Sequence, residues 1–79
     1  MATVRYFAAA RAATGVDAEA VPAGSLKELV EALELRHGDR LSRVLTACSF
    51  LVDGLSCREP ATTLTEASTV DVLPPFAGG

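Results

Sequence analysis

One segment of this chain, residues 25–38, carries every signal of an amphipathic helix. Ser25 and Glu28 form a capping box, in which the hydroxyl and the carboxylate satisfy free backbone amides of the first turn. Gly38 supplies the stop. Four apolar residues follow the spacing of one buried helical face: Leu26, Leu29, Val30 and Leu33. One such helix covers one face of one sheet, so the rest of the chain is expected to supply that sheet.

Short alternating runs on both sides of this helix indicate β-strands. They cover residues 3–7, 16–21, 49–52, 55–58 and 69–73. An alanine-rich helical turn, residues 8–13, connects the first two runs, and a second short helical turn is expected over residues 40–45. Asp53-Gly54 is a strong hairpin dipeptide between the third and fourth runs. Leu64 is expected to reach the core from the loop before the last strand.

The alternation also assigns side chains to the two faces of the sheet. In the first run, Val4 and Tyr6 share one face, and Arg5 and Phe7 share the other, which leaves the Phe7 ring on a polar face. In the second run, Asp17 and Glu19 are expected on one face and Val16, Ala18 and Ala20 on the other.

The order of these elements predicts an α+β fold. The final strand can lie parallel beside the first, with the main helix as part of the crossover. This is the β-grasp, or ubiquitin-like, arrangement: a mixed sheet covered by one main helix. The chain of 79 residues is expected to form a single domain, residues 1–79, in which residues 74–79 project as a C-terminal tail from a central strand.

Composition excludes several classes of function. Hydrophobic residues make up 49% of the chain and charged residues 22%, which is typical of a folded domain rather than a disordered segment. A net charge of −3 provides no basic stripe for nucleic acid. No apolar stretch approaches membrane-spanning length and no signal peptide is visible, so we expect no membrane partner and a cytoplasmic location.

The residues that most often carry chemistry are few. Cys48 and Cys57 lie diagonally in the expected hairpin, too far apart for an unstrained disulfide, and are interpreted as reduced packing residues. His37 is expected at the surface in the last turn of the main helix. Two cysteines and one histidine without a CxxC motif make a poor metal site, so no metal is expected. The chain shows no internal catalytic machinery.

The C-terminal sequence points to a different kind of reactive group. Pro74-Pro75 favours a stiff, extended segment, and Phe76 puts a large ring where it cannot join a core by itself. Gly78 and Gly79 lack a Cβ and therefore fit a narrow active site. A carboxylate is a poor electrophile, but adenylation makes it a mixed anhydride that a sulfur nucleophile attacks to give a thiocarboxylate. The pattern predicts a tail that is delivered into the pocket of another protein.

Both ends of the chain resemble a known family. The segment Val4-Arg5-Tyr6-Phe7-Ala8-Ala9-Ala10-Arg11 resembles the opening strand and turn of the MoaD family, the small sulfur-carrying subunit of molybdopterin synthase in the MoaD/ThiS ubiquitin-like superfamily. The segment Leu73-Pro74-Pro75-Phe76-Ala77-Gly78-Gly79 resembles the C-terminal signature of that family. The related thiamine sulfur carrier also ends in Gly-Gly but usually lacks the Pro-Pro.

The resemblance implies a role for the tail. Gly79 would be adenylated by a ubiquitin-type activating enzyme that uses ATP, and would then become a thiocarboxylate. Pro74, Pro75, Phe76, Ala77 and Gly78 would insert into the large subunit of molybdopterin synthase, where sulfur passes to cyclic pyranopterin monophosphate. The catalytic side chains would belong to the large subunit, and no tightly bound cofactor is implied. Phe7 and Arg11 would belong to the docking surface.

Other functions remain open on the sequence. A carrier with the same chemistry could supply sulfur for thiamine, cysteine or tRNA thiolation. A ubiquitin-like modifier would join Gly79 to target lysines, although an apolar approach to the terminus is unfavourable for a tail that must stay extended in water. A plain interaction module with an idle tail is the third possibility.

Overall fold

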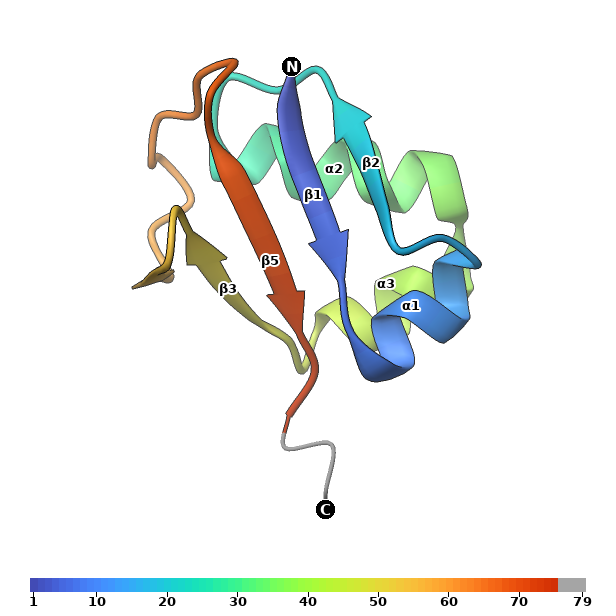
Figure 1. Cartoon of the computed structure of the whole chain (residues 1–79). Coiled ribbons are helices and arrows are strands. Elements are labelled where there is room, and N and C mark those ends of the chain that lie inside the picture. The colour runs from blue at the N-terminus through green and yellow to red at the C-terminus, as the bar shows by residue number, and fades with distance from the viewer. Residues whose placement is uncertain (76–79) are drawn as a thin grey trace.

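A mixed β-sheet with β5 at its centre organises the fold (Figure 1). The computed structural model describes residues 1–75. In this range the strand order is β2-β1-β5-β3-β4. The elements are β1 (Ala2–Tyr6), α1 (Ala8–Thr14), β2 (Ala18–Val21), α2 (Leu26–His37), α3 (Asp39–Leu45), β3 (Ser49–Val52), β4 (Leu55–Cys57) and β5 (Thr69–Leu73). The described range excludes four residues of the predicted tail: Phe76, Ala77, Gly78 and Gly79.

The pairing of β5 confirms the predicted topology. It lies parallel to β1, with Arg5 beside Asp71, and antiparallel to β3, with Leu51 on the other side of Asp71. The antiparallel pair β1–β2, joined through α1, and the hairpin β3–β4 complete the sheet on its two sides. The chain therefore has the expected α+β, β-grasp architecture.

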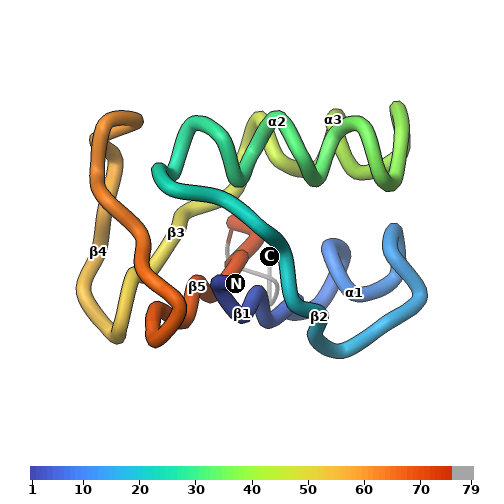
Figure 2. The backbone as a smooth tube through the Cα atoms, turned by 90° about the horizontal axis from the view of Figure 1, so that it is seen from above, coloured from blue at the N-terminus to red at the C-terminus, as the bar shows by residue number. Residues whose placement is uncertain are grey.

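The helices are not distributed evenly over the two faces of the sheet. Figure 2 shows α2 and α3 together over one face, with α1 at the side of β2. Within residues 1–75, no helix covers the opposite face, which is turned toward the viewer in Figure 1. The largest fully buried side chains lie between the helices and the sheet: Val4, Val21, Leu29, Leu33, Leu41, Val70 and Val72.

The main helix forms as its sequence predicts. Ser25 Oγ accepts a hydrogen bond from the Glu28 amide at 3.2 Å, and Glu28 Oε1 accepts one from the Gly24 amide at 2.9 Å. The carboxylate thus reaches one residue further back than in a standard capping box. Leu26, Leu29 and Leu33 are buried, and Val30 is half-buried at the edge of the core.

The predicted hairpin turn is confirmed in its backbone angles. Asp53 and Gly54 have φ values of 51° and 86°, and two positive φ values in succession are the requirement of a type I′ turn. Asp53 also anchors β5, because its backbone amide and its side-chain Oδ1 both bond the backbone of Thr69, each at 2.8 Å. Leu64 is 4% exposed, which confirms that the preceding loop fills the core.

The second strand is shorter than predicted, whereas the predicted placement of Glu19 on one face and of Ala18 and Ala20 on the other is confirmed. The strand begins at Ala18, and its inward side chains are Glu19 and Val21, whereas Ala18 and Ala20 are exposed. An alanine gains little from burial because it removes little apolar surface from water. Glu19, in contrast, finds several hydrogen-bond donors on the helix side of the sheet, so it can be partly buried.

Candidate functional site

The expected tail begins where the central strand ends. The strand β5 ends at Leu73, Pro74 is half-buried beside it, and Pro75 is exposed. Because β1 and β3 flank β5 on both sides, its last residues are held on two sides by backbone pairing. The prediction that the last strand is central is thereby confirmed. The roles assigned to Phe76, Ala77, Gly78 and Gly79 fall outside residues 1–75 and stay predictions.

Phe7 lies next to this point. It is the residue between β1 and α1, and its amide donates to the carbonyl of Val72 at 3.3 Å. Its side chain is 40% exposed, as the alternation predicts, and its ring centroid lies 5.9 Å from the guanidinium carbon of Arg5. An aromatic ring held beside the base of the tail is well placed to contact a partner that also grips the tail.

Arg11 lies one helical turn after Phe7. Its amide bonds the Phe7 carbonyl at 3.4 Å, so the two residues share the first turn of α1. Its guanidinium forms an ion pair with Asp17 at 3.5 Å, and both side chains are largely exposed. Exposed pairs of this kind contribute about 1 kcal/mol or less, so Arg11 can exchange Asp17 for another carboxylate at low cost.

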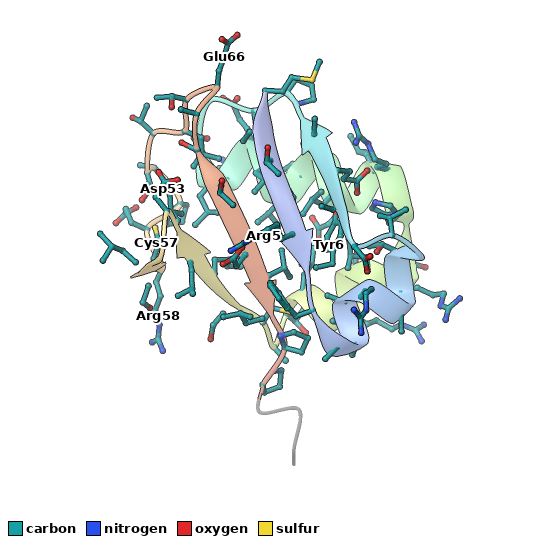
Figure 3. All side chains as sticks on the ribbon, in the orientation of Figure 1. Arg5, Tyr6, Asp53, Cys57, Arg58 and Glu66 are labelled. Atoms are coloured by element: carbon teal, nitrogen blue, oxygen red, sulfur yellow. The ribbon has the colours of Figure 1, made fainter. Side chains whose placement is uncertain are left out.

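An ion pair lies in the middle of the sheet face that no helix covers within residues 1–75. The guanidinium of Arg5, a residue labelled in Figure 3, donates to both carboxylate oxygens of Asp71, and the distance from Nη2 to Oδ2 is 2.8 Å. Asp71 is 7% exposed, whereas the Arg5 side chain remains largely in solvent. The hydrogen bond from Arg5 to Asp71 raises the pKa of that guanidinium. The pair ties β5 to β1 two residues before β5 ends.

A second polar cluster lies on the helix side, around Glu19. Its carboxylate accepts the hydroxyl of Tyr6, and it bonds Nε2 of His37 at 2.5 Å. Nη1 of Arg36 also donates to the Glu19 carboxylate, at 2.9 Å. These contacts connect β1 and β2 to the C-terminal end of α2.

The cluster corrects the prediction for His37. Its side chain is only 14% exposed, and its ring meets the edge of Tyr6 with centroids 5.9 Å apart, so it is not a surface group. The sequence reading placed His37 correctly in the last turn of the helix, but it did not see that this turn faces Glu19. The sequence contained one signal for this contact. Arg36 and His37 are adjacent, and together they can bind a carboxylate such as that of Glu19.

The three donors also control the ionisation of Glu19. Partial burial alone would raise the pKa of the carboxyl, but the hydrogen bonds from Tyr6, His37 and Arg36 outweigh it and lower the pKa to about 2. Burial, with the bond to Glu19, raises the pKa of the Tyr6 hydroxyl. Glu19 therefore stays ionised at neutral pH, and its contacts fasten the sheet to α2.

Both cysteines are free thiols that line one open cleft of about 530 Å³ between the start of α2 and the β3–β4 hairpin. Cys48 Sγ contacts the Val44 carbonyl at 3.1 Å, and burial raises the pKa of this thiol. Cys57 Sγ lies 3.0 Å from the Thr62 hydroxyl. In residues 1–75, no three His, Cys, Asp or Glu side chains form a group that could hold a metal ion. Nor is any helix there long and apolar enough to cross a membrane.

The fold and the sequence match known proteins. The model of the ThiS family matches residues 4–79. A putative molybdopterin converting factor, subunit 1, from Pyrococcus furiosus is 26% identical, with a TM-score of 0.81, and the match covers 95% of this chain and 97% of that one. A chain in a complex of subunits 1 and 2 of molybdopterin-converting factor from Helicobacter pylori is also 26% identical, with a TM-score of 0.73, and the match covers 99% of this chain and 97% of that one.

Another match comes from a protein modifier. The small archaeal modifier protein 1 from Methanosarcina acetivorans has a TM-score of 0.88 at 20% identity, with 99% of this chain and 95% of that one covered. No curated protein sequence matches the chain.

The fold and the matches together define a ubiquitin-like β-grasp domain of the kind found in sulfur carriers and in small protein modifiers. The chain belongs to the ThiS family. The Helicobacter pylori relative forms a complex with a second subunit, so a protein partner is consistent with this class.

Proposed function

We propose that the protein is a sulfur carrier for molybdopterin synthesis, the small subunit of molybdopterin synthase. The observation that carries this proposal is the position of β5, the central strand, directly before the sequence Pro-Pro-Phe-Ala-Gly-Gly. A domain built in this way gives the tail a rigid base, because β5 is paired with a strand on each side. The likeness to two molybdopterin converting factor subunits supports the choice of pathway.

The chemistry takes place at the carboxylate of Gly79. A carboxylate oxygen attacks the α-phosphorus of ATP on an activating enzyme, and pyrophosphate leaves. A sulfur nucleophile then attacks the acyl carbon of the adenylate, and AMP leaves with the electron pair of the C–O bond. The resulting thiocarboxylate is a good nucleophile at neutral pH. It donates its sulfur to cyclic pyranopterin monophosphate inside the large subunit.

The carrier and the large subunit have different roles in the proposed reaction. The carrier supplies the sulfur, the narrow Gly78-Gly79 end and the docking surface, to which we assign Phe7 and Arg11. Their place beside the end of β5 supports this role, because a partner that receives the tail must also approach them. Catalytic side chains belong to the large subunit.

A second candidate function is that of a ubiquitin-like modifier. The observation in its favour is the close structural likeness to small archaeal modifier protein 1, at a sequence identity that shows the fold alone. Isopeptide-linked conjugates of the chain in cell lysate would favour this function. Sulfur delivery to thiamine, cysteine or tRNA is distinguished from the molybdopterin pathway by the acceptor that takes up the sulfur.

Reconstitution tests the proposal. The protein is incubated with its activating enzyme, ATP and a sulfur donor, and the C-terminal peptide is examined by mass spectrometry. One oxygen should be exchanged for sulfur on that peptide alone. Addition of the large subunit and cyclic pyranopterin monophosphate should then consume the sulfur and form the dithiolene. A thiocarboxylate that forms but is never consumed would assign the carrier to another pathway.

Phe76→Ala should weaken the complex with the large subunit. If the ring fills a partner pocket, its burial contributes roughly 1.5–3 kcal/mol, which corresponds to a roughly ten- to hundredfold rise in the dissociation constant. The thermal unfolding of the free domain should stay nearly unchanged. Titration calorimetry gives the affinity, and an equal affinity for both proteins would remove Phe76 from the interface.

A further inference from the structure

The backbone of Phe7 is held on two sides at the point where β1 passes into α1. Its amide donates to the Val72 carbonyl of β5 at 3.3 Å, and its carbonyl accepts the Ala10 amide of α1 at 3.0 Å. The next residue, Ala8, has a φ of 49°, a left-handed conformation that is uncommon for residues other than glycine. Such a conformation persists only where the surrounding structure enforces it. The Cβ of Phe7 therefore has a fixed position beside the end of β5.

The ring of Phe7 needs a further restraint, because a fixed backbone still allows rotation about the side-chain bonds. The ring is partly exposed and does not belong to the buried core. Arg5 lies two residues earlier on the same face of β1, and its guanidinium carbon is 5.9 Å from the ring centroid. A cation within about 6 Å of a ring centroid is attracted by the ring quadrupole. Arg5 therefore favours one orientation of the ring among those that rotation allows.

The guanidinium of Arg5 is itself held in place. Its Nε and Nη2 donate to the two carboxylate oxygens of Asp71, and this two-point contact fixes the plane of the guanidinium. Asp71 is buried on a strand that is paired on both sides, so its carboxylate has little freedom to move. An ammonium lacks the planar fork of donors that this contact requires. Asp71, Arg5 and Phe7 thus form a series in which each side chain restrains the next.

We infer that Arg5 and Asp71 are positioning residues, which hold the Phe7 ring in the orientation that the docking partner meets. This inference rests on the proposed function only for the identity of that partner, the large subunit of molybdopterin synthase. A ring that is already held loses less conformational freedom on docking, so the complex gains affinity without an additional contact. Asp71 is buried, and its expected effect on binding is transmitted by Arg5 rather than by a contact of its own.

Nuclear magnetic resonance of the free chain measures the orientation of the ring. In the wild type, the three-bond couplings about χ1 of Phe7 should report one dominant rotamer. Asp71→Asn weakens the two-point contact, and the couplings should move toward the average of several rotamers. Arg5→Lys should have the same effect, and it replaces the first variant if that one does not fold. Averaged couplings in the wild type, or unchanged couplings in the folded variants, would overturn the inference.

The affinity for the large subunit tests the consequence for docking. Asp71→Asn should raise the dissociation constant roughly three- to tenfold, because the ring must then be ordered on binding. In a Phe7→Ala background, the same substitution should change the dissociation constant less than roughly twofold, since the ring through which it acts is absent. Equal effects in the two backgrounds would show that the Arg5–Asp71 pair acts independently of Phe7, contrary to the inference.

Glu19→Gln is the matched control for stability. It weakens a charged cluster on the helix side of the sheet and leaves the contact between Arg5 and Asp71 in place. Its Phe7 couplings and its affinity for the large subunit should equal those of the wild type. If Glu19→Gln and Asp71→Asn instead lose affinity in proportion to their loss of stability, the positioning role is wrong. If the large subunit does not bind the wild type, the proposed function fails and the Phe7 couplings alone decide the positioning role.

Discussion

A chain with one alanine added after Gly79 should lose sulfur transfer completely. The added residue moves the reactive carboxylate away from the nucleotide and puts a methyl group into a passage that fits glycine. Removal of Gly79 should have the same result. The measurement is the exchange of oxygen for sulfur on the C-terminal peptide, followed by dithiolene formation with the large subunit.

The fold supplies the control for this experiment. Among residues 1–75, the buried hydrophobic residues of the core lie between Ala2 and Val72, and we expect both variants to unfold at the same temperature as the wild type. Loss of activity then reflects the terminus rather than the domain. An extended chain that intact mass shows to be untrimmed, and that still supplies sulfur, would mean that the carrier proposal is wrong.

Glu19→Gln should lower the free energy of unfolding by about 2–3 kcal/mol at pH 7, since a charged acceptor of three hydrogen bonds becomes neutral. The folded-state pKa of about 2 lies below the ordinary value of 4.5. The stabilisation is therefore fully present above the ordinary value and is lost as the pH falls toward the folded value. Urea unfolding should show the full difference between the two proteins at pH 7 and a much smaller one near pH 2.

Glu66→Gln is the matched control. Glu66 is exposed on the loop before β5 (Figure 3), and the same unit of charge is removed. Substitution there should change the free energy of unfolding by no more than about 0.5 kcal/mol. If the two variants lose equal stability, or if the loss at Glu19 does not depend on pH, the cluster contributes through packing rather than charge.

The sequence was sufficient for the topology because local signals and the global fold agree. The capped helix after Ser25, the Asp53-Gly54 turn and the alternation in the last strand each specify one element. A crossover through the main helix then allows the last strand to lie parallel beside the first, as observed. The sequence did not show which face of the second strand is buried, because Ala18 and Ala20 have a small apolar area that does not decide it.

The polar contacts were less predictable because they depend on register between distant segments. Arg5 and Asp71 meet only when β1 and β5 pair in the observed register, and the sequence offers several other registers of the same alternation. His37 reaches Glu19 only because the end of α2 passes over β2. The sequence singled out Phe7 because its apolar ring falls on the polar face of the first strand. The structure puts Phe7 beside the end of β5.

The central position of β5 has a mechanical consequence. A partner that grips the tail and then lets it go exerts tension along the axis of β5. The hydrogen bonds to β1 and β3 lie across this axis on both sides, so they share the load in shear and must break together. An edge strand would peel away one bond at a time. If the tail enters a partner as proposed, the domain should therefore stay folded when the tail is withdrawn.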